Sequence, residues 1–237
     1  EVVNQAVKRL LYCKLRIGLF EKPYSDEKLA VDIEREEKNA QTALLAAQKS
    51  LILLKNENNI LPLDSKKIKT LGVIGPNADA VLIGGYSDSP RHAVTLLEGL
   101  RERLGDSVRV VYSEGCRITE PGSWFRDEVQ LPDPEEEHIR IERALSIAQE
   151  CDLIILAVGE NELVCREAWA PGHPGDSASL DLPGNQNELI TRLSKSGKPL
   201  VAVLFHGRAI SMNVLNESAD AIIDCWYPGQ EGGRAIA

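Results

Sequence analysis

The sequence predicts an α/β fold with a mostly parallel sheet that is covered by helices on both faces. Short runs rich in Val, Ile and Leu recur along the chain at 51–54, 71–75, 108–112, 153–159, 200–205 and 221–226. Amphipathic stretches separate them at 92–104, 135–150, 185–195 and 209–218. Continuous apolar strands that alternate with helices are typical of parallel sheets buried on both faces.

The first 50 residues follow a different pattern and are expected to be helical. Apolar residues recur at helical spacing from Val3 to Leu19, and Gly18 and Pro23 interrupt the pattern. A charged segment follows. An Ala-rich stretch from Glu34 to Ser50 then predicts a second helix, with acidic residues at its start and Lys49 near its end, as the helix dipole favours.

Composition excludes several classes of function. The chain has 237 residues, of which 43% are hydrophobic and 27% charged, and its net charge is −9. This acidic balance argues against a nucleic-acid partner, which requires a basic surface. No apolar run approaches the roughly 18 residues that a membrane span needs. The amino terminus starts with Glu, lacks an uninterrupted apolar core and so is not a signal peptide. Since no initiator Met is present, we expect the chain to start inside a longer protein.

The five cysteines show no CxxC spacing, so neither a zinc site nor a redox motif is expected. Most are expected to be small buried side chains, because Cys151 and Cys225 flank or lie in apolar strands. Their odd number neither supports nor excludes secretion. The sequence does not fix the localisation, and a secreted or periplasmic protein is favoured slightly over a cytoplasmic one.

Other motifs carry little chemistry. The segment VIGPNAD, residues 73–79, lacks the glycines and the lysine of phosphate-binding loops, and it predicts a tight strand-end turn built on Gly75 and Pro76. The GxSxG pattern of serine hydrolases is absent. His173 and His206 have no metal-ligand spacing and are expected to be loop or core histidines.

Three carboxylates follow the apolar run at 153–159 directly. Glu160, Glu162 and Glu167 lie at the start of a long loop rich in Gly, Pro and Ser. Parallel sheets bind ligands in the loops beyond the carboxyl ends of their strands. These side chains are therefore either solvated loop charges or include a general acid whose surroundings raise its pKa.

Several segments, in this order, resemble glycoside hydrolase family 3, the family of β-glucosidases and β-xylosidases. They are RIGLFEKPY (16–24), KSLILLKNENNILPL (49–63), VIGPNAD (73–79), GGYSDSPRHAVTLLEGL (84–100), LAVGE (156–160), LDLPGNQNELI (180–190), GKPLVAVL (197–204) and ADAIIDCWYPGQEGGRAIA (219–237). The resemblance covers nearly the whole chain. The segments 113–137 and 170–177 lack clear family character.

The resemblance implies a domain organisation. Residues 1–33 resemble the last helix of a TIM-type barrel and the linker that follows it, and the rest of that barrel is missing from this sequence. Residues 34–50 would form a connecting helix. Residues 51–237 resemble the family's α/β sandwich domain, truncated at its C-terminus.

The resemblance also implies a site and a reaction. Members of the family hydrolyse terminal β-D-glucosyl or β-D-xylosyl residues with retention, using a nucleophilic Asp in a barrel motif that ends in Asp-Trp, which this sequence lacks. The acid/base Glu follows a Gly-Glu pair on the sandwich domain. In GENELVCREA, six residues separate Gly159-Glu160 from Glu167-Ala168, so Glu167 matches this position. Another branch places the Glu two residues earlier, which is Cys165 here. Glu162 is the fallback.

The segment GGYS resembles a family segment that supplies an aromatic wall for the leaving-group sugar. Tyr86 would stack on that sugar, and Asp88 or Arg91 would bond its hydroxyls. The alternative is a buried Tyr86 that packs under its loop. No metal and no organic cofactor are implied. The expected partners are a β-linked oligosaccharide or glycoside and the missing barrel domain of the same chain. A second hypothesis for the whole chain is a catalytically silent domain that binds sugar or serves as a scaffold.

Overall fold

Six strands form one sheet in the part of the chain that the computed structural model describes, which is residues 1–34, 36–87, 90–171, 173 and 175–237. The strand order is β1-β6-β5-β4-β2-β3. All neighbouring strands are parallel except β1 and β6. The predicted mostly parallel α/β fold is confirmed. The strands are β1 (Ile52–Asn56), β2 (Thr70–Ile74), β3 (Arg109–Ser113), β4 (Leu153–Gly159), β5 (Leu200–Phe205) and β6 (Ala221–Asp224).

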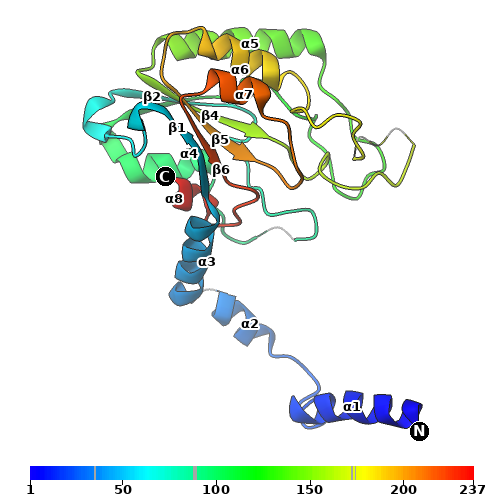
Figure 1. Ribbon diagram of the computed structural model, residues 1–237. Coiled ribbons are helices and arrows are strands. Elements are labelled where there is room, and N and C mark those ends of the chain that lie inside the picture. Colours follow the sequence, from blue (N-terminus) through cyan, green and yellow to red (C-terminus); the bar gives the residue numbers. More distant parts are fainter. Residues whose placement is uncertain (35, 88–89, 172, 174) are drawn as a thin grey trace. The chain divides into compact units, whose positions relative to one another are not determined.

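Helices cover both faces of the sheet (Figure 1). One face carries α4 (Leu96–Leu104) and α8 (Gly232–Ile236), and the other carries α5 (Pro134–Gln149), α6 (Gln186–Ser194) and α7 (Asn213–Ser218). Crossovers between parallel strands are right-handed. The chain moves outward from β2 to β3 and then in the opposite direction through β4, β5 and β6. This reversal therefore puts α4 on one face and α5, α6 and α7 on the other. Short 3₁₀ turns complete the domain at Glu57–Asn59, Ser65–Lys67 and Gly105–Ser107.

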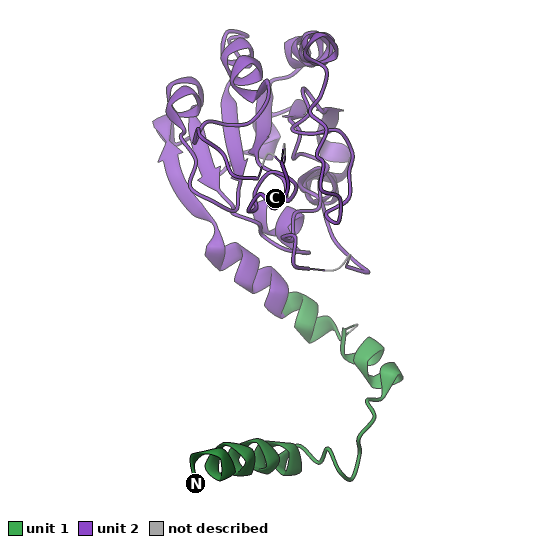
Figure 2. Cartoon of the chain, turned by 90° about the vertical axis from the view of Figure 1, so that its right-hand side faces the viewer, with its two compact units in different colours: residues 1–41 green, residues 42–237 purple. Residues whose placement is uncertain are grey.

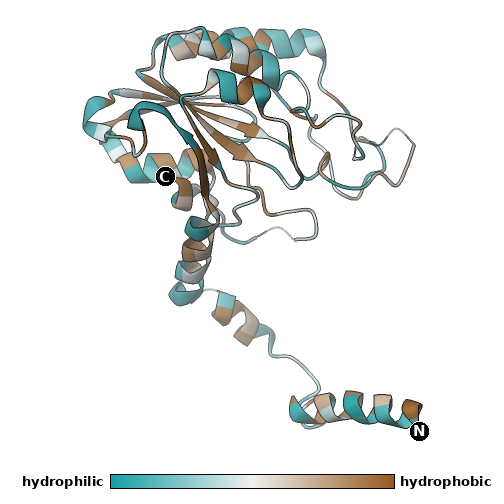
Figure 3. Ribbon diagram, viewed as in Figure 1, coloured by the Kyte–Doolittle hydropathy of each residue, from teal (hydrophilic) through white to brown (hydrophobic). Residues whose placement is uncertain are grey.

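The central strand β4 shows why its sequence is continuously apolar. All seven of its residues are buried. Successive side chains of a strand point to opposite faces of the sheet. Ile154, Leu156 and Val158 accordingly join the core cluster that includes residues of α5 and α6, and Leu153 and Ile155 join the cluster that includes residues of α4. Figure 3 shows the central strands largely in brown, the colour of apolar residues.

The prediction of a buried strand at 51–54 is wrong in its details. Strand β1 lies at the edge of the sheet, pairs with β6 in the antiparallel sense and has a register shift between Leu53 and Lys55. Its side chains are partly exposed, with Leu53 at 56% and Leu54 at 45%. An apolar run by itself does not distinguish a central strand from an edge strand, which has only one neighbour.

The chain divides into two compact units, residues 1–41 and 42–237 (Figure 2). The first contains α1 (Val2–Arg16) and α2 (Glu27–Glu34), and α3 (Glu37–Ser50) crosses the boundary. The sequence does not predict a helix in the charged segment, but Asp26 accepts hydrogen bonds from the amides of Lys28 and Leu29 at the start of α2. The helix expected over 34–50 starts only at Glu37.

The apolar stripe of α1 is exposed, since this helix has no buried residue. Among the described residues no helix is both long and apolar enough to cross a bilayer. The assignment of residues 1–33, 34–50 and 51–237 to separate domains stays a prediction.

The turn after β2 confirms the interpretation of VIGPNAD as a tight strand end. Gly75 has a φ of 126°, and its carbonyl oxygen accepts a hydrogen bond from the amide of Ala78 at 3.2 Å. A Cβ at Gly75 would lie 2.0 Å from the carbonyl oxygen of Ala157 in β4. A side chain is therefore excluded both by the backbone conformation and by the neighbouring strand.

Gly75→Ala is expected to destabilise the protein more than Gly197→Ala. Gly197 also has a positive φ, 74°, but no atom lies within 4 Å of the place that a Cβ would occupy, so Ala there meets backbone strain alone, about 1–2 kcal/mol. At Gly75 the clash with β4 adds about 1–3 kcal/mol. Urea unfolding of both variants measures the difference, and equal costs would contradict the packing argument.

Candidate functional site

The loops after β2 and β4 meet where the strand order reverses. Because β2 lies between β3 and β4, the chain leaves β2 in one direction and leaves β4 in the other, which is where open α/β sheets form ligand crevices. The side-chain amide of Asn77 donates to the carbonyl oxygen of Glu160 at 2.8 Å. The amides of Ile83 and Gly84 donate to Oε1 of Glu162 at 3.1 and 3.2 Å. The two loops are thus joined by several hydrogen bonds.

Gln186 fixes the end of β4. Its side chain is fully buried, accepts from the amide of Gly159 at 2.8 Å, and donates to the carbonyl oxygens of Gly159 and Pro183, each at 2.8 Å. A Cβ at Gly159 would lie 1.7 Å from the carbonyl oxygen of Phe205. The loop therefore leaves the sheet at a defined point. Sequence reasoning missed Gln186, because a polar residue at a helix start gives no sign that it is buried.

Glu160 and Arg208 form an ion pair at the base of the loop. Glu160 is 1% exposed, and its Oε1 accepts from Nε of Arg208 at 2.6 Å. Nη1 of the same guanidinium donates to the carbonyl oxygen of Gly175 at 2.7 Å. One side chain therefore contacts both the start and the end of the segment 160–175. Sequence reasoning also missed Arg208, which follows β5 and lies far from Glu160 along the chain.

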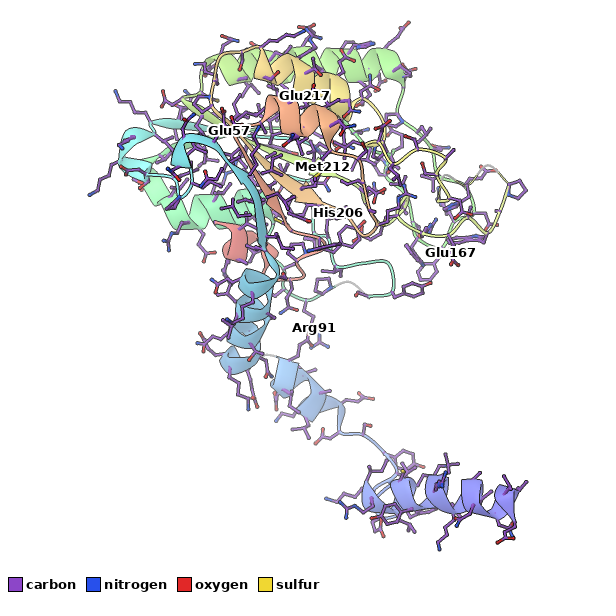
Figure 4. The ribbon with its side chains drawn as sticks, viewed as in Figure 1. Glu57, Arg91, Glu167, His206, Met212 and Glu217 are labelled. Carbon is purple, nitrogen blue, oxygen red and sulfur yellow. The ribbon has the colours of Figure 1, made fainter. Side chains whose placement is uncertain are left out.

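The three carboxylates have different surroundings. Glu160 is buried in its ion pair, and Glu162 accepts two backbone amides, so both hold the loops in place. Glu167 is exposed. Figure 4 places Glu167 on the irregular loops beyond the carboxyl ends of β4 and β5. Of these three residues, Glu167 is the exposed one.

Arg166, the residue before Glu167, packs against two tryptophans. The Cζ atom of its guanidinium lies 4.4 Å from the ring centroid of Trp124 and 4.0 Å from that of Trp169. Its Nε lies 2.9 Å from Nε2 of His173, whose ring stacks on Trp169 at 4.7 Å. Burial and the charge of Arg166 hold the pKa of His173 below its usual value. A neutral imidazole is consistent with this close approach to a cation.

The residues predicted to contact sugar are not all brought together. Tyr86 is 100% exposed and its ring meets the edge of Trp124 at 5.7 Å, so the alternative of a tyrosine buried under its loop is wrong. Asp88 lies outside the described residues. Arg91 is exposed, and Figure 4 shows it apart from Glu167. Tyr86 is linked to the segment of Glu167 through the rings of Trp124 and the guanidinium of Arg166.

A cleft of about 510 Å³ lies between the loops that follow β2, β3 and β4. Gly84, Arg117 and Glu162 are among the residues that line this cleft. Glu167 is not among its described lining residues. The described residues contain no group of three or more His, Cys, Asp or Glu side chains arranged to hold a metal.

The two histidines singled out from the sequence are buried, as expected for core or loop histidines. Nε2 of His206 lies 2.9 Å from Oδ1 of Asp224, and its Nδ1 lies 2.8 Å from the carbonyl oxygen of Arg208. The prediction that most cysteines are buried is confirmed, since Cys116, Cys151 and Cys225 are buried.

Comparison with known proteins relates the whole chain to glycosidases. Residues 51–237 match the family described as "Glycosyl hydrolase family 3 C-terminal domain". A β-xylosidase from Formosa agariphila is 38% identical over 99% of this chain and 31% of its own. A periplasmic β-glucosidase from Salmonella typhimurium is 33% identical over 99% of this chain and 32% of its own.

The fold is similar to that of solved glycosidases as well. The structure of a β-glucosidase from Erythrobacter marinus superimposes with a TM-score of 0.90 at 41% identity, covering 99% of this chain and 32% of that one. The chain thus spans about a third of the length of the relatives it matches.

Arg208→Met is expected to cost about 3 kcal/mol of unfolding free energy, because it leaves Glu160 buried without its cation. Arg109→Met is the matched control, since its pair with Glu150 is exposed and is worth about 0–1 kcal/mol. Adding Glu160→Gln to Arg208→Met should recover part of the loss in urea unfolding. Strict additivity of the two substitutions would show that the pair is not coupled.

Proposed function

The chain belongs to glycoside hydrolase family 3, and from this premise we propose that it is the α/β sandwich part of a retaining, exo-acting β-glycosidase. The longer polypeptide that contains this chain is called the full-length enzyme. It would hydrolyse terminal β-D-glucosyl or β-D-xylosyl residues. This chain would supply the general acid/base Glu167 and part of the sugar site, and a barrel domain would supply the nucleophilic Asp. The names of the relatives support the substrate class, and their greater length leaves room for such a barrel.

The observation that carries the proposal is the difference among the three carboxylates. A proton donor must reach the glycosidic oxygen, so its carboxyl group has to be accessible and free of competing structural bonds. Glu160 is committed to Arg208, and Glu162 is committed to two backbone amides. Glu167 is exposed and lies between Glu160 and Gly175, which are both bonded to Arg208. The carboxyl group of Glu167 is thus accessible to a substrate, while the backbone on both sides of it is anchored through Arg208.

The chemistry divides naturally between two domains. In a retaining glycosidase two carboxyl groups lie about 5–5.5 Å apart across the glycosidic bond. The barrel Asp would attack the anomeric carbon while Glu167 donates its proton to the departing oxygen, which leaves as an alcohol. Glu167, now a carboxylate, would then take a proton from the water that displaces the barrel Asp and releases the sugar.

Tyr86 would form one wall of the leaving-group site. Tyr86 is fully exposed and its ring lies in a T-shaped arrangement with that of Trp124, so it presents an aromatic face of the kind that stacks on sugars. The roles of Asp88 and Arg91 as hydroxyl partners stay predictions. A silent sugar-binding or scaffolding domain is the competing function, and the variants below distinguish it from an enzyme.

Glu167→Ala in the full-length enzyme should reduce hydrolysis of glycosides with poor leaving groups by on the order of 10²–10⁴-fold. Substrates with good leaving groups need little protonation, so their glycosylation step should change far less. Added azide should accelerate the second step, because it attacks the glycosyl-enzyme without base assistance and yields a β-glycosyl azide. Steady-state kinetics over a series of leaving groups, with product analysis, measures all three effects.

Glu162→Ala and Glu160→Ala are the controls for this experiment. Both remove contacts that hold the loops, so they should lower activity on all substrates alike and give no azide product. If azide rescues Glu162→Ala and leaves Glu167→Ala unchanged, the acid/base assignment moves to Glu162.

The 237-residue chain by itself should not hydrolyse an aryl β-glucoside, because no glycosyl-enzyme forms without the barrel nucleophile. Its circular dichroism should nevertheless show the folded α/β domain. Turnover clearly above that of a Glu167→Ala version of the same chain would place the nucleophile within these residues.

A further inference from the structure

We propose that the segment Trp124–Asp127, on the loop between β3 and α5, positions the catalytic carboxylate by binding the residues on either side of Glu167. This inference rests on the proposed role of Glu167 as the acid/base and adds the part of the fold that orients it. The segment does not touch substrate in this scheme, and its effect passes through Arg166 and Trp169.

Arg166 makes the first set of contacts with this segment. Its Nη1 donates to the carbonyl oxygen of Trp124 at 2.5 Å, and its Nη2 donates to that of Arg126 at 3.3 Å. The same guanidinium packs against the Trp124 ring at 4.4 Å. A planar guanidinium is suited to this combination of two donors and a ring contact, which a lysine ammonium does not reproduce.

Trp169 makes the second set of contacts. Its indole Nε1 donates to Oδ1 of Asp127 at 2.7 Å, and its ring centroid lies 6.3 Å from that of Trp124. Glu167 is thus flanked by two side chains that bind the same short segment. Only Ala168 separates Glu167 from Trp169, so the backbone that carries the carboxylate has little freedom between its two attachments.

The backbone of Arg166 and Glu167 also packs closely against Gly175. A Cβ at Gly175 would lie 2.3 Å from the carbonyl oxygen of Arg166 and 2.9 Å from the carbonyl carbon of Glu167. The carbonyl oxygen of Gly175 in turn accepts from Arg208. The backbone at Arg166 and Glu167 therefore lies in direct contact with a glycine that is bonded to the base of the loop.

Trp124 also contacts the loop that carries Tyr86. A Cβ at Gly85 would lie 1.9 Å from Cζ3 of Trp124, so this position admits no side chain while the indole is in place. The indole of Trp124 therefore influences the positions of two candidate groups. It contacts the acid Glu167 through Arg166, and it contacts the sugar platform at Tyr86 through Gly85.

The test uses the full-length enzyme and two substrates that share the same sugar, an alkyl β-glucoside and 2,4-dinitrophenyl β-glucoside. The readout is the ratio of their kcat/KM values within one enzyme preparation. Any fraction of unfolded or inactive protein cancels in this ratio. A purely structural role lowers both values together and leaves the ratio unchanged.

Arg166→Met and Trp124→Ala should each lower the alkyl-to-dinitrophenyl ratio by on the order of 10–100-fold, because they misplace the proton donor that only the alkyl substrate needs. Asp127→Ala should act in the same direction. Asp127→Asn keeps an oxygen acceptor for Trp169, and Trp124→Phe keeps an aromatic face for Arg166, so both should retain most of the ratio. Glu128→Ala, at the neighbouring exposed position, should leave it unchanged.

Glu167→Ala, measured in parallel, separates the two levels of the proposal. If Glu167→Ala lowers the ratio and Arg166→Met and Trp124→Ala do not, the positioning role is wrong while the acid/base assignment stands. If Glu167→Ala itself leaves the ratio unchanged, the assignment of the acid/base fails. Loss of both kcat/KM values by the same factor in Arg166→Met and Trp124→Ala also overturns the positioning role.

Discussion

The guanidinium of Arg208 is the contact on which the candidate site depends most directly. It neutralises Glu160, a carboxylate that is 1% exposed and would be costly to bury alone, and it binds the carbonyl oxygen of Gly175. A segment of irregular backbone is thereby closed at its base by one side chain. Without Arg208, Glu160 would lose the cation that neutralises it, and the carbonyl oxygen of Gly175 would lose its hydrogen-bond donor.

The sheet determines where this closed loop stands. β4 is buried along its whole length and ends at Gly159, where Gln186 occupies the backbone donor and acceptor of the terminal residue. Because β2 and β4 are neighbouring parallel strands, the loops that follow them start side by side and share hydrogen bonds. The sheet and the residues that bond to it thus fix the start of the loop at Glu160. Arg166 and its aromatic neighbours fix the part of the loop next to Glu167.

The two arginines divide this work in a way that suits their chemistry. Each uses more than one nitrogen, and each contacts a backbone carbonyl in addition to a second group, a carboxylate for Arg208 and indole rings for Arg166. Guanidinium groups provide several donors in one plane, so one side chain joins segments that are distant in sequence. Glu167 directly follows Arg166, lies between the two residues that Arg208 binds, Glu160 and Gly175, and is itself exposed.

Much of the fold, and less of the site, was predictable from the sequence. β4 and β5 were located to the residue because continuous apolar runs end abruptly at their boundaries, whereas β1 and α2 were misjudged because an edge strand and a charged helix lack a distinctive pattern. The loop carboxylates could be found from their place after β4. Their different surroundings depend on contacts with Arg208, 48 residues from Glu160, and with Trp124, 42 residues from Arg166. A local sequence pattern does not reveal contacts between residues so far apart.

The most direct measurement is the crystal structure of the full-length enzyme with its nucleophile trapped as a 2-deoxy-2-fluoroglycosyl ester. The carboxyl group of Glu167 should then lie about 5–5.5 Å from that of the esterified Asp, on the side of the departing oxygen, as a retaining mechanism requires. A carboxyl separation beyond about 9.5 Å, or another carboxylate in that place, would contradict the assignment of Glu167 and with it the proposed role of this chain.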